Sequence, residues 1–480
     1  MTTWSPRVAS PVRLALVTHG CKANQADEAA LVDALAARLG GLELTGADDG
    51  DADLVVINSC TVTGAAAADA RKAARRARAQ NRGARILVTG CYAETDREAL
   101  LSIPEVDEVV GNHEKAHLPR LAEALLAHGT GRLGRGEPEG GERNPARHAR
   151  FREQSPSLRS IADLRALPRG VARPFVKVQD GCDYVCSFCI IPTARGPSRS
   201  RPLAEVAAEI RALAALGARE VVLTGIHLGH WGRQLTPRRR FGSMLEALLD
   251  RTESDGDHPA PRLRVSSLEP NEVDDHVIDL VTSHPRVCPH LHVPLQSGDD
   301  GILAAMKRVY RASYYQRVVE RFRARTTTGA FGLDVMVGFP GEGRAQFETT
   351  HHFLKSLDVS YLHIFPYSVR TGTLAASMPD QVSPADKKER VATLAALSTL
   401  RREEHARRSV GTTVDVVVEH TRVAPSPHTS SHVEPGKCGG YSGNYVEVEI
   451  SVPQPARSLV RATIVEACRG RVVGELEEVG

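Results

Sequence analysis

Short runs of aliphatic and β-branched residues alternate with helix-length segments along most of the chain. In the first 125 residues, such runs occupy Leu14 to Thr18, Leu54 to Asn58 and Ile86 to Thr89, and each is followed by a small turn and a helical pattern. Alternation of strands and helices is typical of a parallel sheet with helices packed on its faces. We therefore predict a parallel α/β domain over residues 1–128.

The alternation continues over residues 171–407, where helical segments separate six strand candidates. These candidates are Phe175–Gln179, Val221–Gly225, Leu263–Ser266, His290–Pro294, Gly332–Phe339 and Tyr361–Tyr367. Six strand–helix units are too few to close an eight-stranded barrel, so the pattern predicts an open (β/α)6 partial TIM barrel. Its site should lie at the carboxyl ends of the strands, and its open side leaves room for a large substrate.

Two segments depart from this alternation. Between residues 129 and 170 the sequence is rich in Gly, Pro, Arg and Glu with little apolar periodicity, which indicates a linker. Residues 408–480 carry short β-like runs with glycine-rich turns, a pattern typical of a small β-barrel. The chain is therefore expected to be an α/β protein that ends in a small all-β domain.

The composition indicates where the protein is located and the state of its cysteines, but it does not indicate the function. The 480 residues carry a formal net charge of +3, which gives no bulk electrostatic argument for a nucleic-acid partner. No run of 18 apolar residues occurs, and the start, Met-Thr-Thr-Trp-Ser-Pro, lacks the apolar stretch of a secretion signal. We expect a cytoplasmic protein without a membrane segment. In a reducing compartment its nine cysteines should be ligands or buried thiols rather than disulfides.

Three cysteines, Cys182, Cys186 and Cys189, stand on one short loop directly after the first strand of the predicted partial barrel. A cubane 4Fe–4S cluster usually takes four cysteines, so a set of three leaves one iron open to a small molecule. A zinc site or three unrelated buried thiols are the alternatives, but zinc prefers a closed set of four ligands. The Cys-x3-Cys-x2-Cys spacing, with Phe188 before the last cysteine, resembles the loop of radical S-adenosylmethionine (SAM) enzymes.

A second set of three cysteines is spread over the N-terminal domain. Cys21, Cys60 and Cys91 each follow a predicted strand, although 39 and 31 residues separate them. Carboxyl ends of parallel neighbours meet along one edge of a sheet, where α/β proteins bind ligands. Three half-buried cysteines are the alternative. The repeated placement favours a second iron–sulfur cluster with three protein ligands.

Polar and glycine-rich segments follow the strands of the predicted partial barrel. Any one of them could be turn chemistry, but on the edge that carries the cysteine loop they predict a ligand cavity. The residues expected to contact SAM there are Phe188, Gly225, Glu269, Gln296 and Ser297.

Candidate RNA contacts are of three kinds. Arg195, Arg199 and Arg201 follow the cysteine loop and suit a phosphate-bearing substrate, with structural ion pairs as the alternative. Tyr441 and Tyr445 could stack on bases, although residues 411–480 hold six Lys or Arg against nine Asp or Glu. A basic helical segment is either a solvated face or an RNA phosphate track; it carries Arg71, Lys72, Arg75, Arg76, Arg78 and Arg82.

Taken together, the chain resembles the radical-SAM methylthiotransferases, and most closely their branch that acts on N6-threonylcarbamoyladenosine (t6A) in tRNA. The resemblance covers the chain apart from residues 129–170 and includes the domain order, whose last member is called TRAM. The segments that carry it are residues 19–25 (HGCKANQ), 58–63 (NSCTVT), 90–93 (GCYA), 190–192 (IIP) and 195–201 (RGPSRSR).

The resemblance implies two 4Fe–4S clusters, SAM, and transfer of a methylthio group to C2 of t6A at position 37 of tRNA. The cluster at Cys182, Cys186 and Cys189 would chelate SAM, and an auxiliary cluster would sit at the other three cysteines. An electron donor such as flavodoxin or ferredoxin is implied, whereas the sulfur donor is not identified. Three alternatives stay open: isopentenyl-adenosine tRNA as substrate, a ribosomal-protein aspartate as substrate, or a non-catalytic iron–sulfur RNA-binding protein.

Overall fold

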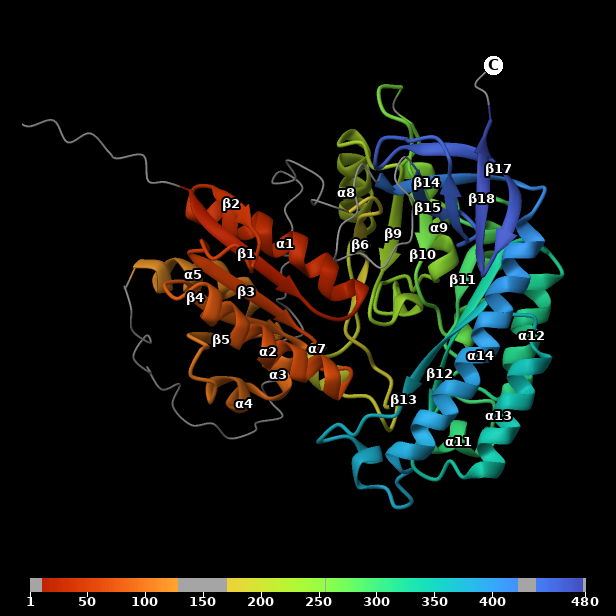
Figure 1. The fold of residues 1–480 in the computed structure, drawn as a ribbon, viewed down its shortest axis with the longest axis horizontal. Helices are drawn as coiled ribbons and strands as arrows, with labels where there is room; N and C mark the ends of the chain where they lie inside the picture. Colours follow the sequence, from red (N-terminus) through yellow and green to blue (C-terminus); the bar gives the residue numbers. More distant parts are fainter. Residues whose placement is uncertain (1–10, 128–170, 255, 422–436, 478–480) are drawn as a thin grey trace, which may run out of the picture. The chain divides into compact units, whose positions relative to one another are not determined.

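The computed structural model describes residues 11–127, 171–254, 256–421 and 437–477 (Figure 1). The predicted linker over 129–170 lies outside the described residues. The described chain forms two compact units, one made of residues 11–127 with Ile190–Pro197 and one made of residues 171–189 with residues 198–477. The chain therefore leaves the second unit directly after Cys189 and returns to it at Ser198. The division into three domains at residues 128, 171 and 408 stays a prediction.

The first unit is built on a five-stranded parallel sheet in the order β2-β1-β3-β4-β5. Its strands are β1 (Val12–Thr18), β2 (Leu42–Thr45), β3 (Leu54–Ser59), β4 (Arg85–Gly90) and β5 (Glu108–Gly111). The helices are α1 (Lys22–Leu39), α2 (Gly64–Gln80), α3 (Cys91–Thr95), α4 (Arg97–Leu101), η1 (Asn112–His117), α5 (Leu118–Ala127) and α7 (Ile191–Arg195). The predicted parallel α/β domain is confirmed, while β2 and β5 were not expected from the sequence.

Both faces of this sheet are covered by helices. Leu31 and Leu35 of α1 pack with α5 on one face, and the alanine stripe of α2 packs on the other (Figure 1). That stripe, Ala67, Ala70, Ala74 and Ala77, repeats at helical spacing and is buried, so the opposite face of α2 is left to its basic residues. Burial on both faces explains why β3 and β4 are continuous apolar runs.

The second unit contains the six predicted parallel strands in two three-stranded sheets, β10-β9-β6 and β11-β12-β13. Parallel bridges between Leu263 and Val287 and between Ser267 and His292 join the two sheets, so the strands form an open partial barrel as predicted. The strands are β6 (Phe175–Lys177), β9 (Glu220–Thr224), β10 (Arg262–Val265), β11 (His290–His292), β12 (Ala330–Val337) and β13 (Tyr361–Pro366).

Helices separate these strands along the chain. They are α8 (Leu203–Ala215), α9 (Phe241–Arg251), α10 (Asp275–Ser283), α11 (Asp300–Ala305), α12 (Ala312–Arg323), α13 (Arg344–Ser356) and α14 (Pro384–Ser409), with short η3 (Leu228–His230), η4 (Pro270–Glu272) and η5 (Leu374–Ser377). Helix α14 runs along β13 (Figure 1). No helix among the residues that the structure describes is long and apolar enough to cross a bilayer.

The C-terminal strands close into a five-stranded barrel in the order β14-β15-β16-β18-β17. They are β14 (Thr413–Thr421), β15 (Cys438–Ser442), β16 (Glu447–Ile450), β17 (Leu459–Cys468) and β18 (Arg471–Leu476). Its core is aliphatic and includes Val416, Val448 and Ile464, with Ala406 of α14 packed against it. The predicted small β-barrel is confirmed and fits a TRAM domain.

A buried ionic cluster joins the C-terminal barrel to the partial barrel. Glu220 on β9 is fully buried and accepts hydrogen bonds of 2.6 Å from both Arg262 and Arg264 of β10. Arg264 also donates to the carbonyls of Ser442 and Gly443 at 2.9 and 3.0 Å, and Arg262 donates to that of Asp415 at 3.0 Å. The carboxylate therefore holds two guanidinium groups that contact the backbone of the next domain.

Candidate functional site

The loop with Cys182, Cys186 and Cys189 begins at a small antiparallel pair that closes its base. Strand β7 (Gln179–Asp180) pairs with β8 (Arg199–Ser200). Buried Gln179 donates to the carbonyls of Asp180 and Gly181 at 2.9 and 2.7 Å, and its side-chain oxygen accepts from the backbone N–H of His227 at 2.8 Å. Gln179 thus ties the start of the cysteine loop to the segment after β9.

Hydrogen-bond donors face the sulfur atoms of this loop. The Cys182 Sγ lies 3.3 Å from His227 Nδ1 and 3.4 Å from the N–H of Tyr184, and Arg308 donates to Cys186 Sγ at 3.1 Å. Burial raises the pKa of Cys182 to about 12, and burial also raises that of Cys186 although Arg308 opposes it. Metal coordination would keep such thiols deprotonated despite their burial. N–H donors beside the sulfur atoms suit thiolate ligands. The assignment of these three cysteines as cluster ligands stays a prediction.

Arg308 connects this loop to a predicted SAM residue. Its guanidinium forms an ion pair with the carboxylate of Glu269 and lies over the ring of Tyr310, whose hydroxyl donates to the carbonyl of Leu295 at 2.9 Å. Burial raises the pKa of Glu269, with Arg308 acting in the opposite direction. Nothing local in the sequence marks Arg308, which lies 122 residues from Cys186.

The remaining predicted SAM residues lie in the same unit in different settings. Gln296 has a left-handed backbone conformation, with φ of 72°. Its backbone N–H and backbone carbonyl both form hydrogen bonds with β12. Ser297 is fully buried, and its hydroxyl contacts that of Thr350 at 3.1 Å. Gly225 lies against Gln179, and Phe188 packs beside an apolar cluster that includes Met306 and Phe339. Their role in SAM binding stays a prediction.

The cysteines of the first unit lie where the sequence placed them, at the carboxyl ends of three adjacent strands. Cys21 caps α1 after β1, Cys60 follows β3, and Cys91 begins α3 after β4. Cys60 and Cys91 are buried and Cys21 is exposed. Burial raises the pKa of Cys60 to about 11, and Cys91 and Cys21 are close enough to act on it electrostatically in the same direction. The fold therefore brings these three thiols together.

Two glycines allow this close approach. A Cβ built on Gly20 would lie 2.5 Å from Cys60 Sγ, and one on Gly90 would lie 2.2 Å from the carbonyl oxygen of Ser59. Both glycines have φ near the left-handed region, at +96° and +99°. Side chains at these two positions would force the strand ends apart, which explains why glycine precedes Cys21 and Cys91.

Asn24 joins the three cysteine-bearing turns. Its amide nitrogen donates to the carbonyls of His19 and Ser59 at 2.9 and 3.0 Å, and its side-chain oxygen lies 3.9 Å from Cys91 Sγ. Asn58 in turn donates to the Asn24 carbonyl at 2.8 Å. Asn24 belongs to the HGCKANQ segment, but its part in aligning the turns could not be deduced from the sequence.

The predicted RNA residues are placed as follows. Arg195 is 2% exposed within the first unit, and its guanidinium faces Cys91, Asn24 and Asp27. Arg201 forms a 2.7 Å ion pair with buried Glu209, which fits the structural alternative, and Arg199 lies in β8. RNA contact by these arginines stays a prediction.

The two predicted tyrosines are partly buried in the second unit. Tyr445 stacks on His290 at 4.6 Å and on Tyr441 at 5.1 Å, and Arg173 lies 5.0 Å from the Tyr441 ring centre. The basic face of α2 is partly engaged as well, since Arg78 pairs with Asp107 at 2.7 Å and Arg76 pairs with Asp48. RNA stacking by the tyrosines stays a prediction.

Two groups of histidines and carboxylates in the described part of the chain have the geometry of a site for a single metal ion. The two groups bring their potential ligand atoms within 4.8 Å of one another: His227, His230 and Glu272, and His292, Asp334 and His363. Each contains a 2.9 Å or shorter His–carboxylate contact. Neither group contains a cysteine, but the first lies beside the cysteine loop, because His227 Nδ1 is 3.3 Å from Cys182 Sγ.

Comparison with known proteins agrees with this division of the chain. Residues 13–111 match an uncharacterized protein family, UPF0004, and residues 176–354 match the Radical SAM superfamily. Among solved structures, the radical SAM methyltransferase TsrM from Kitasatospora setae has a TM-score of 0.54 at 20% identity and covers 76% of this chain and 77% of its own. That likeness supports the fold.

Full-length relatives define the family. A threonylcarbamoyladenosine tRNA methylthiotransferase, MtaB, of Rickettsia prowazekii is 32% identical over 88% of this chain and 90% of its own, and that of Bacillus subtilis is 34% identical over 91% and 89%. A tRNA-2-methylthio-N(6)-dimethylallyladenosine synthase of Clavibacter michiganensis is 34% identical over 86% and 74%. The chain therefore belongs to the radical SAM methylthiotransferases, enzymes that use a 4Fe–4S cluster and SAM.

Proposed function

We propose that the protein adds a methylthio group to C2 of t6A at position 37 of tRNA. The observation that carries the reaction type is the presence of two separate sets of three thiols, one on the loop after β7 and one at the carboxyl ends of β1, β3 and β4. The substrate follows from the MtaB relatives, which match about nine-tenths of the chain and of their own length. Action on a tRNA would place the enzyme in the cytoplasm.

The SAM cluster would be held by Cys182, Cys186 and Cys189. Their sulfur atoms accept hydrogen bonds from Tyr184 and Arg308, which suits thiolate ligands. When bound, such a cluster would supply the electron that breaks one C–S bond of the SAM sulfonium, which gives methionine and a carbon radical. Arg308 orients Glu269, so that this carboxylate can accept hydrogen bonds from the amino or hydroxyl groups of SAM.

The auxiliary cluster would be held by Cys21, Cys60 and Cys91. Here Asn112 donates to Cys91 Sγ at 3.3 Å and the N–H of Val62 lies 3.5 Å from Cys60 Sγ, so donors face the sulfur atoms at this site too. Cys21 is exposed, which leaves access for a sulfur-bearing co-substrate.

A two-site enzyme suits the chemistry of the substrate. The C2–H bond of adenine has no acidic proton and no leaving group, so general acid–base catalysis cannot functionalise it. A radical generated at one site would abstract this hydrogen atom, and the other site would supply the sulfur, which a separate SAM molecule would methylate. The protein contributes orientation of the reacting groups and exclusion of water.

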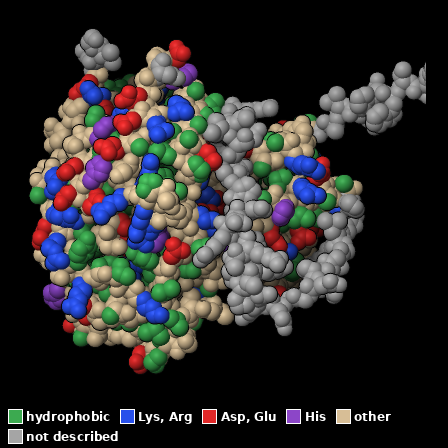
Figure 2. Space-filling model, turned by 180° about the vertical axis from the view of Figure 1, so that it is seen from behind, with side chains coloured by type: hydrophobic (Ala, Val, Ile, Leu, Met, Phe, Trp, Pro, Cys, Tyr) green, Lys and Arg blue, Asp and Glu red, His purple; other side chains and the backbone are tan. Residues whose placement is uncertain are grey.

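We further propose that Arg199, Arg201, Tyr441 and Tyr445 take part in tRNA binding. On the face shown in Figure 2, Lys and Arg side chains are interspersed with Asp and Glu. Binding would then rely on local contacts rather than on the small net charge of +3. The electron donor is proposed to be a flavodoxin- or ferredoxin-type protein.

The test is an anaerobic assay with reconstituted protein, SAM, dithionite and tRNA that carries t6A. Mass spectrometry of the nucleosides should show a methylthio group on t6A. Parallel reactions contain isopentenyl-adenosine tRNA, which the Clavibacter relative favours as a second candidate, or a ribosomal-protein aspartate. If t6A stays unmodified while the clusters are intact, the proposed substrate is refuted. If the reduced protein does not cleave SAM, the proposed enzymatic activity is refuted, and the alternative of a non-catalytic RNA-binding protein is favoured.

A further inference from the structure

The segment Ile190–Pro197 brings an arginine to the auxiliary thiols. It follows Cys189 directly in the chain, yet it packs in the first unit, where α7 ends at Arg195. The carbonyl of Ala194 accepts a hydrogen bond from Asn112 at 3.0 Å, which anchors the segment to η1. Arg195 therefore reaches its position through a segment that was not expected to belong to this domain.

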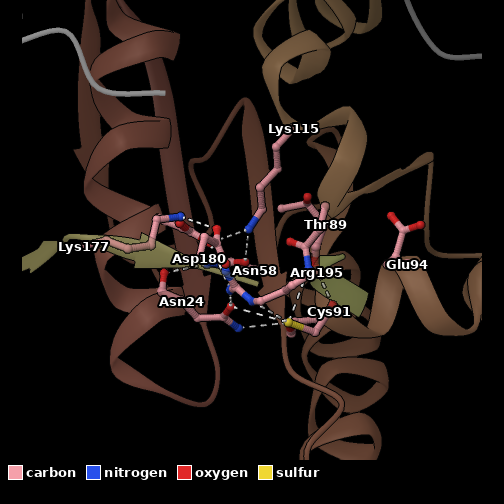
Figure 3. A network of polar contacts seen from close by, with 12 residues as sticks. Asn24, Asn58, Thr89, Cys91, Glu94, Lys115, Lys177, Asp180 and Arg195 are labelled. Atoms are coloured by element: carbon pink, nitrogen blue, oxygen red, sulfur yellow. Dashed lines mark hydrogen bonds and ion pairs between the residues drawn. The ribbon is translucent and has the colours of Figure 1, made fainter. Parts of the chain in front are cut away.

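The guanidinium of Arg195 is fixed on three sides. Its Nε donates to Cys91 Sγ at 3.2 Å, and its terminal nitrogen donates to the side-chain oxygens of Asn24 and Asp27 at 2.5 and 3.0 Å (Figure 3). Asp27 is itself 3% exposed and also pairs with Lys115 at 3.0 Å. Because the planar guanidinium is fixed by hydrogen bonds from both its Nε and a terminal nitrogen, its N–H groups point in defined directions.

The positive charge of a buried arginine is usually compensated by a carboxylate, and a contact with a cysteine is not required for this. Asp27 satisfies the charge of Arg195, so the contact with Cys91 is an additional use of the same guanidinium. Asn112 donates to the same sulfur atom at 3.3 Å and to the Arg195-bearing segment as well. Hydrogen bonds to cysteine sulfur atoms are one of the factors that set the reduction potentials of iron–sulfur clusters.

We propose that Arg195 is a positioning residue that raises the reduction potential of the auxiliary cluster through its hydrogen bond to Cys91. This inference rests on the proposed second cluster. A cationic donor stabilises the more negative, reduced state of a thiolate-ligated cluster, because the negative charge on its sulfur ligands grows when an electron is added. Asn112 acts in the same direction with a neutral donor.

The test isolates the auxiliary cluster in the full-length chain by replacing Cys182, Cys186 and Cys189 with alanine. This triple-alanine protein is the parent, and Arg195→Met and Arg195→Lys are each added to it. All three proteins are reconstituted anaerobically and titrated with dithionite while the cluster is followed by EPR. About four irons per chain are expected for one cubane. The midpoint potential should fall in Arg195→Met and fall less in Arg195→Lys, which keeps the charge but loses the planar guanidinium.

A matched control is Arg85→Met, because Arg85 is also buried in the first unit and pairs with Asp107 at 3.7 Å rather than with a cysteine. Its midpoint potential should equal that of the parent. An unchanged potential in Arg195→Met at equal iron content would overturn the inference. If Arg195→Met binds no iron, Arg195→Lys decides by the same criterion. A parent without iron would instead refute the second cluster, and the role of Arg195 with it.

Discussion

Replacing Glu220 by glutamine removes a buried carboxylate that two arginines share. Burial alone would raise the pKa of Glu220, but Arg264 and Arg262 outweigh it and lower the pKa to about 2 from the ordinary 4.5. This difference corresponds to a stabilisation of ~3 kcal/mol. Breaking a buried ion pair by removing one partner costs about 3–5 kcal/mol, so the two estimates agree. The expected loss is a large part of the roughly 5–15 kcal/mol that stabilises a typical domain.

The measurement is urea unfolding of the cluster-free protein, followed through the fluorescence of Trp231, which is 1% exposed in the same unit. At pH 7, Glu220→Gln should lower the free energy of unfolding by ~3 kcal/mol. Because the folded pKa of Glu220 is depressed, its contribution is complete above pH 4.5 and is lost as the pH falls towards about 2. The two proteins should therefore converge in stability over that acidic range.

The control is Asp279→Asn, which breaks an exposed ion pair with Arg325 in the same unit. Exposed pairs contribute less than ~1 kcal/mol, so this change should leave the transition almost unmoved. A cost below ~1 kcal/mol for Glu220→Gln at pH 7, or a gap between the proteins that persists down to pH 2, would show that the cluster of Glu220, Arg262 and Arg264 does not hold the two barrels together as described.

Three further results are expected. Cys186→Ala should abolish SAM cleavage, whereas Cys60→Ala should spare cleavage and stop methylthio transfer; equal behaviour in both assays would contradict separate roles for the two thiol sets. Arg308→Met removes a charge-assisted contact worth ~1.5–3 kcal/mol and should weaken SAM binding about 10- to 100-fold by equilibrium dialysis, and unchanged affinity would argue against its link to the SAM site. Asn24→Ala should lower iron from about eight to about four per chain, and full iron content would show that the three turns align without it.

Patterns that are local in the sequence predicted most of the architecture. Short aliphatic and β-branched runs between helix-length segments located β1, β3, β4 and the six strands of the partial barrel. The cysteines of the first unit lie at one edge of its sheet because parallel strands share that edge. The strands β2 and β5 were not predicted; they are the two edge strands of the sheet, and β2 is partly exposed.

Contacts between residues that are far apart in the sequence could not be predicted from local patterns. Arg308 is separated from Cys186 by 122 residues and Arg195 from Asn24 by 171, so no spacing rule connects them. The sequence shows the charge of the arginines after the SAM loop, which suits either phosphate contacts or structural ion pairs, but it does not show their burial. Only the fold shows that Arg201 faces Glu209 and that Arg195 faces a thiol.

The excursion of residues 190–197 into the first unit limits how the protein can be dissected. A gene fragment that stops before codon 190 would encode Cys21, Cys60 and Cys91 but would omit the guanidinium that contacts Cys91. An excised N-terminal piece would therefore present these thiols with an altered lining. Supplying the missing octapeptide in trans, or grafting it behind a short glycine linker, is the minimal way to rebuild that environment outside the intact polypeptide.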